Sequence, residues 1–367
     1  MARSIVVAAA QLGPILSVPN PGGPEPRKAA LDRMIALLED AASKGAQLVV
    51  FPELALTTFF PRGMLTDPAE IAAVFEPEDD STPLAASKIL ESPNIKPLFQ
   101  KAAALGVDIS IGYAERYTST AASKTVDYNT AIYYKAASNS VIAKYRKVHL
   151  PGRTFLLPDP KASQQLEKYY FTPGDLGFQA FRVPGLVDAV KAEDKEAAPD
   201  TKTDGKGDPI MGMMICNDRR WPEAWRAYGL QGVELVLCGY NTSDYKPQDE
   251  GTFEEQSAMA LLHHHISCQG GSYTNACFSV NVAKAGTEAE GPGGGLIGGS
   301  VIYDPYGRKV IESKTLEDEL LVATLDLDMC RKQKDTIFNF AQHRRVEHYP
   351  RLVEQVGVVE PALLSKE

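Results

Sequence analysis

One segment of the chain places a cysteine where a nucleophile could work. Cys216 ends an apolar run, and Arg219 and Arg220 follow it before a helix that the sequence predicts to begin at Pro222. Backbone N–H groups at a helix start and nearby cationic side chains lower the pKa of a thiol, and the thiolate is the attacking form. The alternative is an inert core cysteine beside two surface arginines, and this segment alone does not decide between the two. The other four cysteines have no adjacent basic cluster.

Two further residues could act together with such a nucleophile. Glu53 follows the apolar strand that ends at Phe51, and burial there would favour its neutral form and suit a general base or acid near neutral pH. Lys147 comes just after another predicted strand, and its ammonium could stabilise a developing oxyanion. Taken alone, Glu53 could equally be a capping or salt-bridged carboxylate, and Lys147 an exposed lysine at a strand end.

Other candidate motifs fail on their context. The Gly-x-Gly-x-x-Gly pattern over Gly293–Gly298 matches a dinucleotide-binding fingerprint, but a predicted strand follows it where a helix is required, so we expect a loop. Consecutive helical residues point about 100° apart, so the triplet His263–His265 cannot converge on one metal ion, and we expect two of the three to be partly buried. The sequence has no P-loop, serine-hydrolase or zincin motif and no Cys-x-x-Cys pair.

The composition excludes several classes of protein. The chain has 367 residues, of which 44% are hydrophobic, and a formal net charge of −9. A nucleic-acid-binding protein normally carries a basic surface, so we expect no such partner. Apolar runs such as Ile5–Ala10 are far shorter than the ~18 residues of a membrane-spanning helix, and Gln11 interrupts this one, so we expect neither a membrane segment nor a secretory signal. The odd number of cysteines, 5, argues against a disulfide framework and for a reducing, cytoplasmic location.

Strands and helices alternate along the sequence, which predicts an α/β layered fold. A Pro/Gly-rich loop is expected over 17–27, followed by a helix with one apolar face that ends near Gly45. The apolar patterns also predict further strands and helices. Strands are expected at Ser4–Ala9, Leu48–Phe51, Asp108–Gly112, Asn129–Tyr134, Val141–Tyr145, Met211–Ile215, Leu235–Cys238, Phe278–Val282, Ser300–Tyr303 and Leu321–Leu325. Helices are expected near Ile95–Leu105, Pro222–Leu230 and Glu254–Gln269.

The chain reads as a single domain over residues 1–367, with a core at about 4–335 and a C-terminal tail at 336–367. The segment Asp188–Asp208 alternates acidic and basic residues with Ala, Thr and Gly, and it lacks apolar residues after Val190. A strand resumes at Ile210, so we interpret this segment as a solvated insertion rather than a domain boundary.

In chain order, the candidate catalytic residues resemble those of a known family. Glu53 in Phe-Pro-Glu, Lys147 in Tyr-Arg-Lys-x-His and Cys216 in Ile-Cys-Asn-Asp resemble the Glu-Lys-Cys triad of the nitrilase superfamily. Within it, the sequence looks like the N-carbamoyl-D-amino acid amidohydrolase (D-carbamoylase) branch, and the string Cys-Asn-Asp-Arg-Arg-Trp-Pro-Glu is the most specific to that branch. The similar segments run over most of the chain: Phe51–Arg62, Lys144–Gly152, Leu166–Phe171, Pro173–Phe178, Ile215–Glu223, Gly239–Thr242 and Phe338–His343.

The resemblance implies a four-layer α-β-β-α sandwich that forms a homodimer or homotetramer and uses no metal or organic cofactor. It implies that Cys216 is the nucleophile, Glu53 the general base and Lys147 the oxyanion stabiliser, with Glu167 as a second, supporting carboxylate. It also implies a pocket for a small-molecule substrate, lined by Asn217, Arg219, Arg220, Asn241, Thr242, His149 and His263. The sequence departs from the bacterial members at Asp188–Asp208, in part of Glu76–Pro93, and at Gln165, where those members carry a histidine.

The expected reaction is hydrolysis of an N-carbamoyl-D-amino acid to the D-amino acid, ammonia and carbon dioxide. The first alternative is another amidohydrolase of the superfamily, of the β-ureidopropionase or aliphatic amidase type, whose substrate need not carry the α-carboxylate that the arginine pair would bind. A catalytically silent oligomerising protein is disfavoured because all three triad residues are present. An oxidoreductase has only the glycine pattern in its favour.

Overall fold

The apolar segments of the chain form two β-sheets in a computed structural model, which describes residues 3–15, 22–120, 122–187, 207–288 and 294–363. The first sheet has seven strands in the order β15-β1-β2-β4-β5-β6, with β3 paired to β4. β1, β2 and β4 run parallel to one another, and β15, β5 and β6 run antiparallel to their neighbours. The strands are β1 (Ser4–Gln11), β2 (Leu48–Val50), β3 (Glu76–Asp79), β4 (Asp108–Ser119), β5 (Lys124–Lys135), β6 (Ser140–Arg146) and β15 (Glu319–Asp326).

The second sheet has six strands in the order β14-β13-β10-β9-β8-β7, and its three central strands β8, β9 and β10 are parallel. A separate two-stranded ribbon pairs β11 with β12. The strands of these two sheets are β7 (Phe181–Arg182), β8 (Ile210–Ile215), β9 (Leu235–Tyr240), β10 (Phe278–Ala283), β11 (Ala285–Thr287), β12 (Gly295–Ile297), β13 (Val301–Tyr303) and β14 (Lys309–Glu312).

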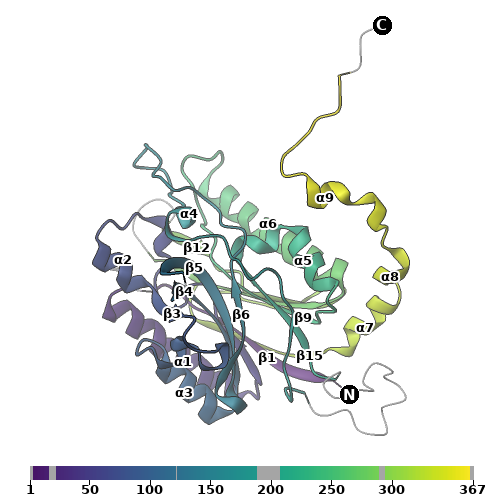
Figure 1. Cartoon of the computed structure of the whole chain (residues 1–367), viewed down its shortest axis with the longest axis horizontal. Helices are drawn as coiled ribbons and strands as arrows, with labels where there is room; N and C mark the ends of the chain where they lie inside the picture. The colour runs from purple at the N-terminus through teal and green to yellow at the C-terminus, as the bar shows by residue number, and fades with distance from the viewer. Residues whose placement is uncertain (1–2, 16–21, 121, 188–206, 289–293, 364–367) are drawn as a thin grey trace.

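Helices cover the outer face of each large sheet, which gives four layers (Figure 1). α1 (Pro24–Ser43) and α3 (Lys96–Leu105) lie on the first sheet, and α5 (Pro222–Gly229) and α6 (Phe253–Asn275) lie on the second. Ile5 and Val7 of β1 enter the core between the sheets, whereas Ala8 and Ala10 face α1. Both faces of β1 are therefore buried, which explains its nearly continuous apolar sequence. The predicted α-β-β-α sandwich is confirmed.

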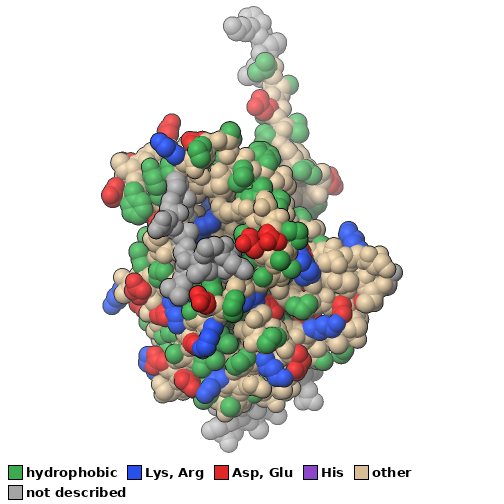
Figure 2. Space-filling view, turned by 90° about the vertical axis from the view of Figure 1, so that its left-hand side faces the viewer, with side chains coloured by type: hydrophobic (Ala, Val, Ile, Leu, Met, Phe, Trp, Pro, Cys, Tyr) green, Lys and Arg blue, Asp and Glu red, His purple; other side chains and the backbone are tan. Residues whose placement is uncertain are grey.

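Shorter helices connect the layers or follow the second sheet. They are α2 (Pro68–Val74), α4 (Glu167–Tyr170), α7 (Asp328–Asp335), α8 (Phe340–His343) and α9 (Pro350–Glu354). The chain after α9 extends away from the body of the protein (Figure 1), and its apolar side chains, such as Val356 and Val358, are almost fully exposed. On the face drawn in Figure 2, acidic and basic side chains are interspersed with hydrophobic ones. Among the described residues, none of the helices combines the length and the hydropathy that crossing a membrane requires.

Every strand and helix expected from the sequence is present, but some boundaries and elements differ. The loop expected over 17–27 is wrong from Pro24 onward, where α1 begins with prolines in its first turn, a position that proline favours. The expected loop at the glycine pattern is wrong over Gly295–Ile297, which forms β12, although Gly298 and Gly299 do adopt positive φ. β3 was not expected, because the sequence Glu-Pro-Glu-Asp is typical of a solvent-exposed segment. In the structure, Glu76 and Glu78 are buried because Arg27, Ser87 and Ser92 bind them.

Most of the proposed insertion Asp188–Asp208 lies outside the described residues. The strand expected after it is present as β8, beginning at Ile210.

Candidate active site

The ends of several strands bring polar side chains together between the two sheets. Glu53 follows β2, Lys147 follows β6 and Cys216 follows β8, while Glu167 begins α4. Carboxyl ends of parallel strands meet at one edge of a sheet, so residues far apart in the sequence converge there. A carboxylate oxygen of Glu53, one of Glu167 and the sulfur of Cys216 all lie within 4.8 Å of one another. The structure thus places the four residues predicted for the triad and its support in one buried cluster.

Cys216 sits at a strained junction between β8 and a 3₁₀ turn, Cys216–Arg220. Its φ of 50° is in the left-handed region, which non-glycine residues rarely adopt and which recurs at functional sites. The thiol is buried and donates a hydrogen bond to the main-chain oxygen of Asn241 at 3.0 Å. The strain turns the sulfur out of the strand and toward the carboxylates.

The expectation that the pKa of this thiol is lowered is wrong, although Arg219 does act in that direction. Burial raises the pKa of Cys216 to about 11, and the charge of Glu53 adds to this effect, while Lys147 and Arg219 oppose it. The thiol is therefore protonated at neutral pH, and forming the thiolate requires a base that can accept its proton. Glu53 and Glu167 each have a carboxylate oxygen within 4.8 Å of its sulfur.

Lys147 lies between the two carboxylates of the cluster. Its ammonium donates hydrogen bonds to Oε1 of Glu53 at 2.7 Å and to Oε2 of Glu167 at 2.5 Å, and all three side chains are fully buried. Burial lowers the pKa of Lys147, but the charges of Cys216, Glu167 and Glu53 outweigh it and raise the pKa above its usual value. Lys147 is therefore a permanent cation in this cluster. Glu53, Glu167 and Cys216 have ligand types and separations that a metal ion could use, but the ammonium already binds both carboxylates.

Glu167 is the carboxylate of the cluster whose pKa is displaced toward neutral pH. Burial raises the pKa of Glu167 to about 7; Lys147 lowers it, and the charge of Glu53 raises it further. Its Oε1 has no hydrogen-bond partner among the described residues. A proton on this oxygen would spare the cluster a second negative charge, so Glu167 can hold or release a proton near neutral pH.

Two asparagines fix the orientation of Glu53. Asn129 in β5 donates to its Oε1 at 2.8 Å, and the backbone N–H of Asn241 donates to its Oε2 at 2.9 Å. The amide of Asn241 also donates to the main-chain oxygen of Glu53 at 3.0 Å. Asn129 was not among the predicted site residues, because it lies in the middle of a strand and only its contact with Glu53, distant in the sequence, reveals its role.

The two arginines that follow Cys216 point in different directions. Arg219 is 1% exposed and donates to the main-chain oxygen of Cys216 (2.5 Å), to Nδ1 of His264 (3.1 Å) and to Oγ1 of Thr242 (3.0 Å). Arg220 is exposed. Arg219 therefore supports the turn that carries the nucleophile, and its predicted place in the substrate pocket stays a prediction.

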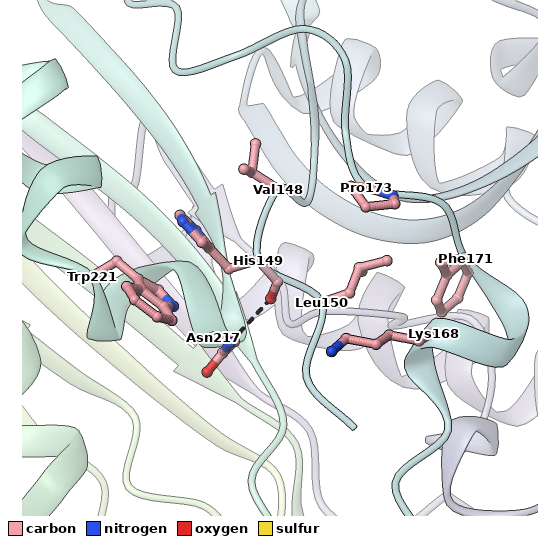
Figure 3. Close-up of a pocket in the computed structure, with 8 residues that line it drawn as sticks. All are labelled: Val148, His149, Leu150, Lys168, Phe171, Pro173, Asn217 and Trp221. Atoms are coloured by element: carbon pink, nitrogen blue, oxygen red, sulfur yellow. Dashed lines mark hydrogen bonds between the residues drawn. The ribbon is translucent and has the colours of Figure 1, made fainter. Parts of the chain in front are cut away.

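A cavity of about 420 Å³ lies beside the turn and contains two of the predicted pocket residues, His149 and Asn217 (Figure 3). The ring of His149 stacks on Trp221 with centroids 4.9 Å apart, and its Nδ1 lies 2.8 Å from Oδ1 of Asp218. The amide of Asn217 donates to the main-chain oxygen of His149 at 3.1 Å. Lys168 lies across the cavity, which is otherwise lined mainly by apolar side chains: Val148, Leu150, Phe171 and Pro173.

A second cavity, of about 390 Å³, contains Arg220, Thr242 and His263. Thr242 directly follows Asn241, whose carbonyl accepts the hydrogen bond of the thiol, and Arg220 ends the turn that begins at Cys216. His263 is exposed on α6, whereas His264 is buried and His265 is half-buried, as predicted for two of the three histidines. The linings of the two cavities share no residue: His149 and Asn217 line the first, Arg220, Thr242 and His263 line the second, and Arg219 and Asn241 line neither.

Comparisons with known proteins agree with this geometry. The sequence model described as "Carbon-nitrogen hydrolase" matches residues 6–335. The chain belongs to the carbon-nitrogen hydrolase family. It is 28% identical over 315 residues to a nitrilase of Pyrococcus abyssi, covering 85% of this chain and 90% of that protein. It is 27% identical over 324 residues to the N-carbamoylputrescine amidase of Arabidopsis thaliana, covering 88% of this chain and 89% of that protein.

Among solved structures, a carbon-nitrogen hydrolase from Helicobacter pylori is similar to this one. The TM-score is 0.71 at 21% sequence identity, with 96% of this chain and 99% of that chain covered. This likeness confirms the nitrilase-type fold. This carbon-nitrogen hydrolase therefore has the fold of its family, with a buried cysteine, two carboxylates and a lysine in one cluster.

Proposed function

We propose that this carbon-nitrogen hydrolase removes the carbamoyl group of N-carbamoyl-D-amino acids, with Cys216 as nucleophile. The observation that carries the proposal is the divergence of Cys216 and Arg220 from one short turn. The thiol of Cys216 faces the buried carboxylates, while Arg220 lines the second cavity. A carbamoyl amino acid has its carboxylate one carbon from the reacting nitrogen, and a guanidinium is well suited to hold it through paired N–H···O bonds.

In the proposed reaction, Glu53 accepts the proton of Cys216, and the thiolate attacks the carbonyl carbon of the carbamoyl group. Lys147 and the backbone N–H of Asn217 bind the oxyanion of the tetrahedral intermediate. The intermediate collapses with cleavage of a C–N bond, and the departing nitrogen takes the proton from Glu53. Glu53 then takes a proton from water, which attacks the thioester carbon; the carbon–sulfur bond breaks and the sulfur of Cys216 takes the proton back from Glu53. The carbamic acid released in this step loses carbon dioxide, which breaks its remaining C–N bond and leaves the amine. The products are the D-amino acid, ammonia and carbon dioxide.

A second candidate substrate is an N-carbamoyl amine, because the cavity of Arg220 also contains four carboxylates. Asp244, Asp249, Glu250 and Glu255 line it together with Arg220 and Lys246. A substrate with a distal ammonium, such as the one for which the Arabidopsis relative is named, would find negative charge there. Because the cavity contains both basic and acidic side chains, a comparison of substrates is needed to distinguish the two candidates.

The test is ammonia release from four substrates at equal concentrations: an N-carbamoyl-D-amino acid, its L enantiomer, N-carbamoylputrescine and a simple aliphatic amide. The proposal expects the highest kcat/KM for the D-amino acid derivative. A preference for N-carbamoylputrescine would favour the second candidate. A preference for the aliphatic amide, or for the L enantiomer, would reject the proposed specificity and leave the amidohydrolase chemistry standing.

A further inference from the structure

A buried ion pair lies behind the loop that carries Glu53, outside the cluster already described. Lys284 follows β10 and Glu288 follows β11, and the two side chains are fully buried. Nζ of Lys284 lies 3.0 Å from Oε1 of Glu288. Neither residue contacts the thiol or the carboxylates of the cluster through any recorded hydrogen bond.

The pair holds the main chain of the Glu53 loop. Nζ of Lys284 donates to the main-chain oxygen of Thr57 at 2.7 Å, and the backbone N–H of Phe59 donates to Oε2 of Glu288 at 2.7 Å. The ion pair therefore satisfies one main-chain acceptor and one main-chain donor only two residues apart. Because these contacts are to the backbone, they fix the path of the loop independently of its side chains.

The opposite side of the same loop is held by close backbone contact. A Cβ on Gly112 would lie 2.8 Å from Cα of Glu53, and a Cβ on Gly239 would lie 2.6 Å from its backbone nitrogen. Leu54, the next residue, has a φ of 48°, in the left-handed region. The strained turn is thus compressed between the strands on one side and the ion pair on the other.

We propose that Lys284 and Glu288 are positioning residues that fix the carboxylate of Glu53 in the catalytic cluster. This proposal rests on the role of Glu53 as the base of the proposed function. A buried ion pair contributes little net stability when compared with apolar residues of the same size, so its placement against this loop is better explained by the position it enforces.

The charge of Lys284 also acts on the cluster. The charged groups facing Glu53 are Lys147, Glu167, Lys284 and, once ionised, Cys216. The charged groups facing Lys284 are Glu288, Arg62 and Glu53. Arg62 also interacts electrostatically with Asp244. Without Lys284, Glu288 would have Arg62 as its remaining cation, at 3.7 Å. Replacing Lys284 with an uncharged residue therefore removes a positive charge that interacts with both Glu288 and Glu53.

The test compares Lys284→Met with Lys284→Arg and with a matched control, Arg3→Met. Arg3 forms a buried ion pair with Glu234 at 2.6 Å and directly precedes β1, whereas Lys284 lies beside Leu12 at the other end of that strand. The loss of Arg3 should therefore affect stability alone. For Lys284→Met we expect kcat to fall by about 10- to 100-fold with little change in KM. We also expect the acid limb of the pH profile to move to higher pH, and Lys284→Arg to recover part of both effects. Arg3→Met should lower Tm and leave the pH profile in place.

The pH dependence of Cys216 alkylation by iodoacetamide gives a readout that needs no substrate. A shift of its profile in Lys284→Met, with no wild-type turnover of any carbamoyl substrate, would keep the positioning role and reject the proposed function. A fall in Tm like that of Arg3→Met, with kcat and both pH profiles unchanged, would overturn the positioning role. If Lys284→Met fails to fold, Glu288→Gln serves instead, because its amide oxygen can still accept from Phe59 while the negative charge is lost. In that variant we expect kcat to fall because Lys284 has lost its partner; an unchanged kcat would reject the proposal.

Discussion

The thiol of Cys216 and the main-chain carbonyl of Asn241 are joined by a 3.0 Å hydrogen bond between the ends of neighbouring parallel strands. The backbone N–H of Asn241 donates in turn to Glu53 at 2.9 Å. Asn241, the residue that follows β9, therefore binds both the proposed nucleophile and the carboxylate proposed to activate it. Since β9 belongs to the second sheet, Asn241 links Cys216 to the Glu53 loop of the first sheet.

The first prediction concerns the reactive thiol. Cys216→Ser should lower turnover by roughly 10⁴-fold or more while preserving Tm, because serine keeps the size but not the nucleophilicity. Iodoacetamide should label Cys216 before the other cysteines, since burial raises the thiol pKa to about 11 at Cys216 but to about 12 at Cys268 and Cys277. Peptide mass spectrometry after partial labelling measures the order. Inactivation that tracks the labelling of Cys238 or Cys268 would contradict this assignment, and Cys277→Ser, remote from the cluster, is the control.

The second prediction concerns Glu167 and the pH dependence of stability. Its pKa in the folded protein is raised by burial from 4.5 to about 7, so the folded state binds this proton more tightly than the unfolded state. Raising the pH from 4.5 to about 7 should therefore destabilise the fold through this group, by about 3 kcal/mol at most. Glu167→Gln cannot titrate and should remove this part of the pH dependence. Urea unfolding of both proteins at pH 5 and pH 8 measures the difference, and equal pH dependence in the two would contradict the assignment.

Much of the fold could be predicted from the sequence because its strands are buried on both faces. Runs such as Leu48–Val50 and Ile210–Ile215 are apolar throughout, and they can be recognised without knowing their neighbours. The positions of Glu53, Lys147 and Cys216 just after such runs made all three visible as candidates. By contrast, β3 could not be recognised, because its glutamates are buried only through partners distant in the sequence.

The details of the site depend on contacts that no local pattern encodes. Nothing in the sequence indicates which of the two adjacent arginines is buried; in the structure it is Arg219, which is bound to His264 on α6. The pKa of the Cys216 thiol depends on how completely the two sheets exclude water from it. The arginines next to it in the sequence predict a lowered pKa, whereas burial raises it. Asn129 and Lys284 likewise acquire their roles from the approach of another element.

The third prediction tests the close packing beneath Glu53. Gly239→Ala would place a Cβ on β9 2.6 Å from the backbone nitrogen of Glu53, so either the strand or the loop that carries Glu53 must shift. We expect the displaced carboxylate to cost about 100-fold in kcat, because small displacements of reacting groups have effects of this size. Gly270→Ala on the exposed side of α6 is the control, since its Cβ would meet no atom within 4 Å. It should stabilise the helix by about 0.5–1 kcal/mol and leave kcat unchanged. Wild-type activity in Gly239→Ala would show that the loop can adjust.

The fourth prediction separates the two arginines. Arg219→Ala would leave the carbonyl of Cys216 and the side chain of Thr242 without their buried donor, so it should lower Tm and reduce turnover of every substrate to the same extent. Arg220 makes no such contacts with the turn and lies in the open cavity. Arg220→Ala should therefore preserve Tm, and any effect on turnover should depend on the substrate.

The substrate dependence is what identifies the target of Arg220. If it binds the carboxylate of a carbamoyl amino acid, Arg220→Ala should lower kcat/KM for the acid by about 30-fold or more and for its uncharged amide analogue far less. Arg220→Lys should recover only part of the loss, because an ammonium restores the charge but not the paired, planar donors. Steady-state kinetics of wild type and both variants on the acid and the amide measure these ratios. Equal losses on the two substrates would mean that Arg220 does not recognise the carboxylate, and the four carboxylates of the same cavity would then favour a substrate that carries an amine.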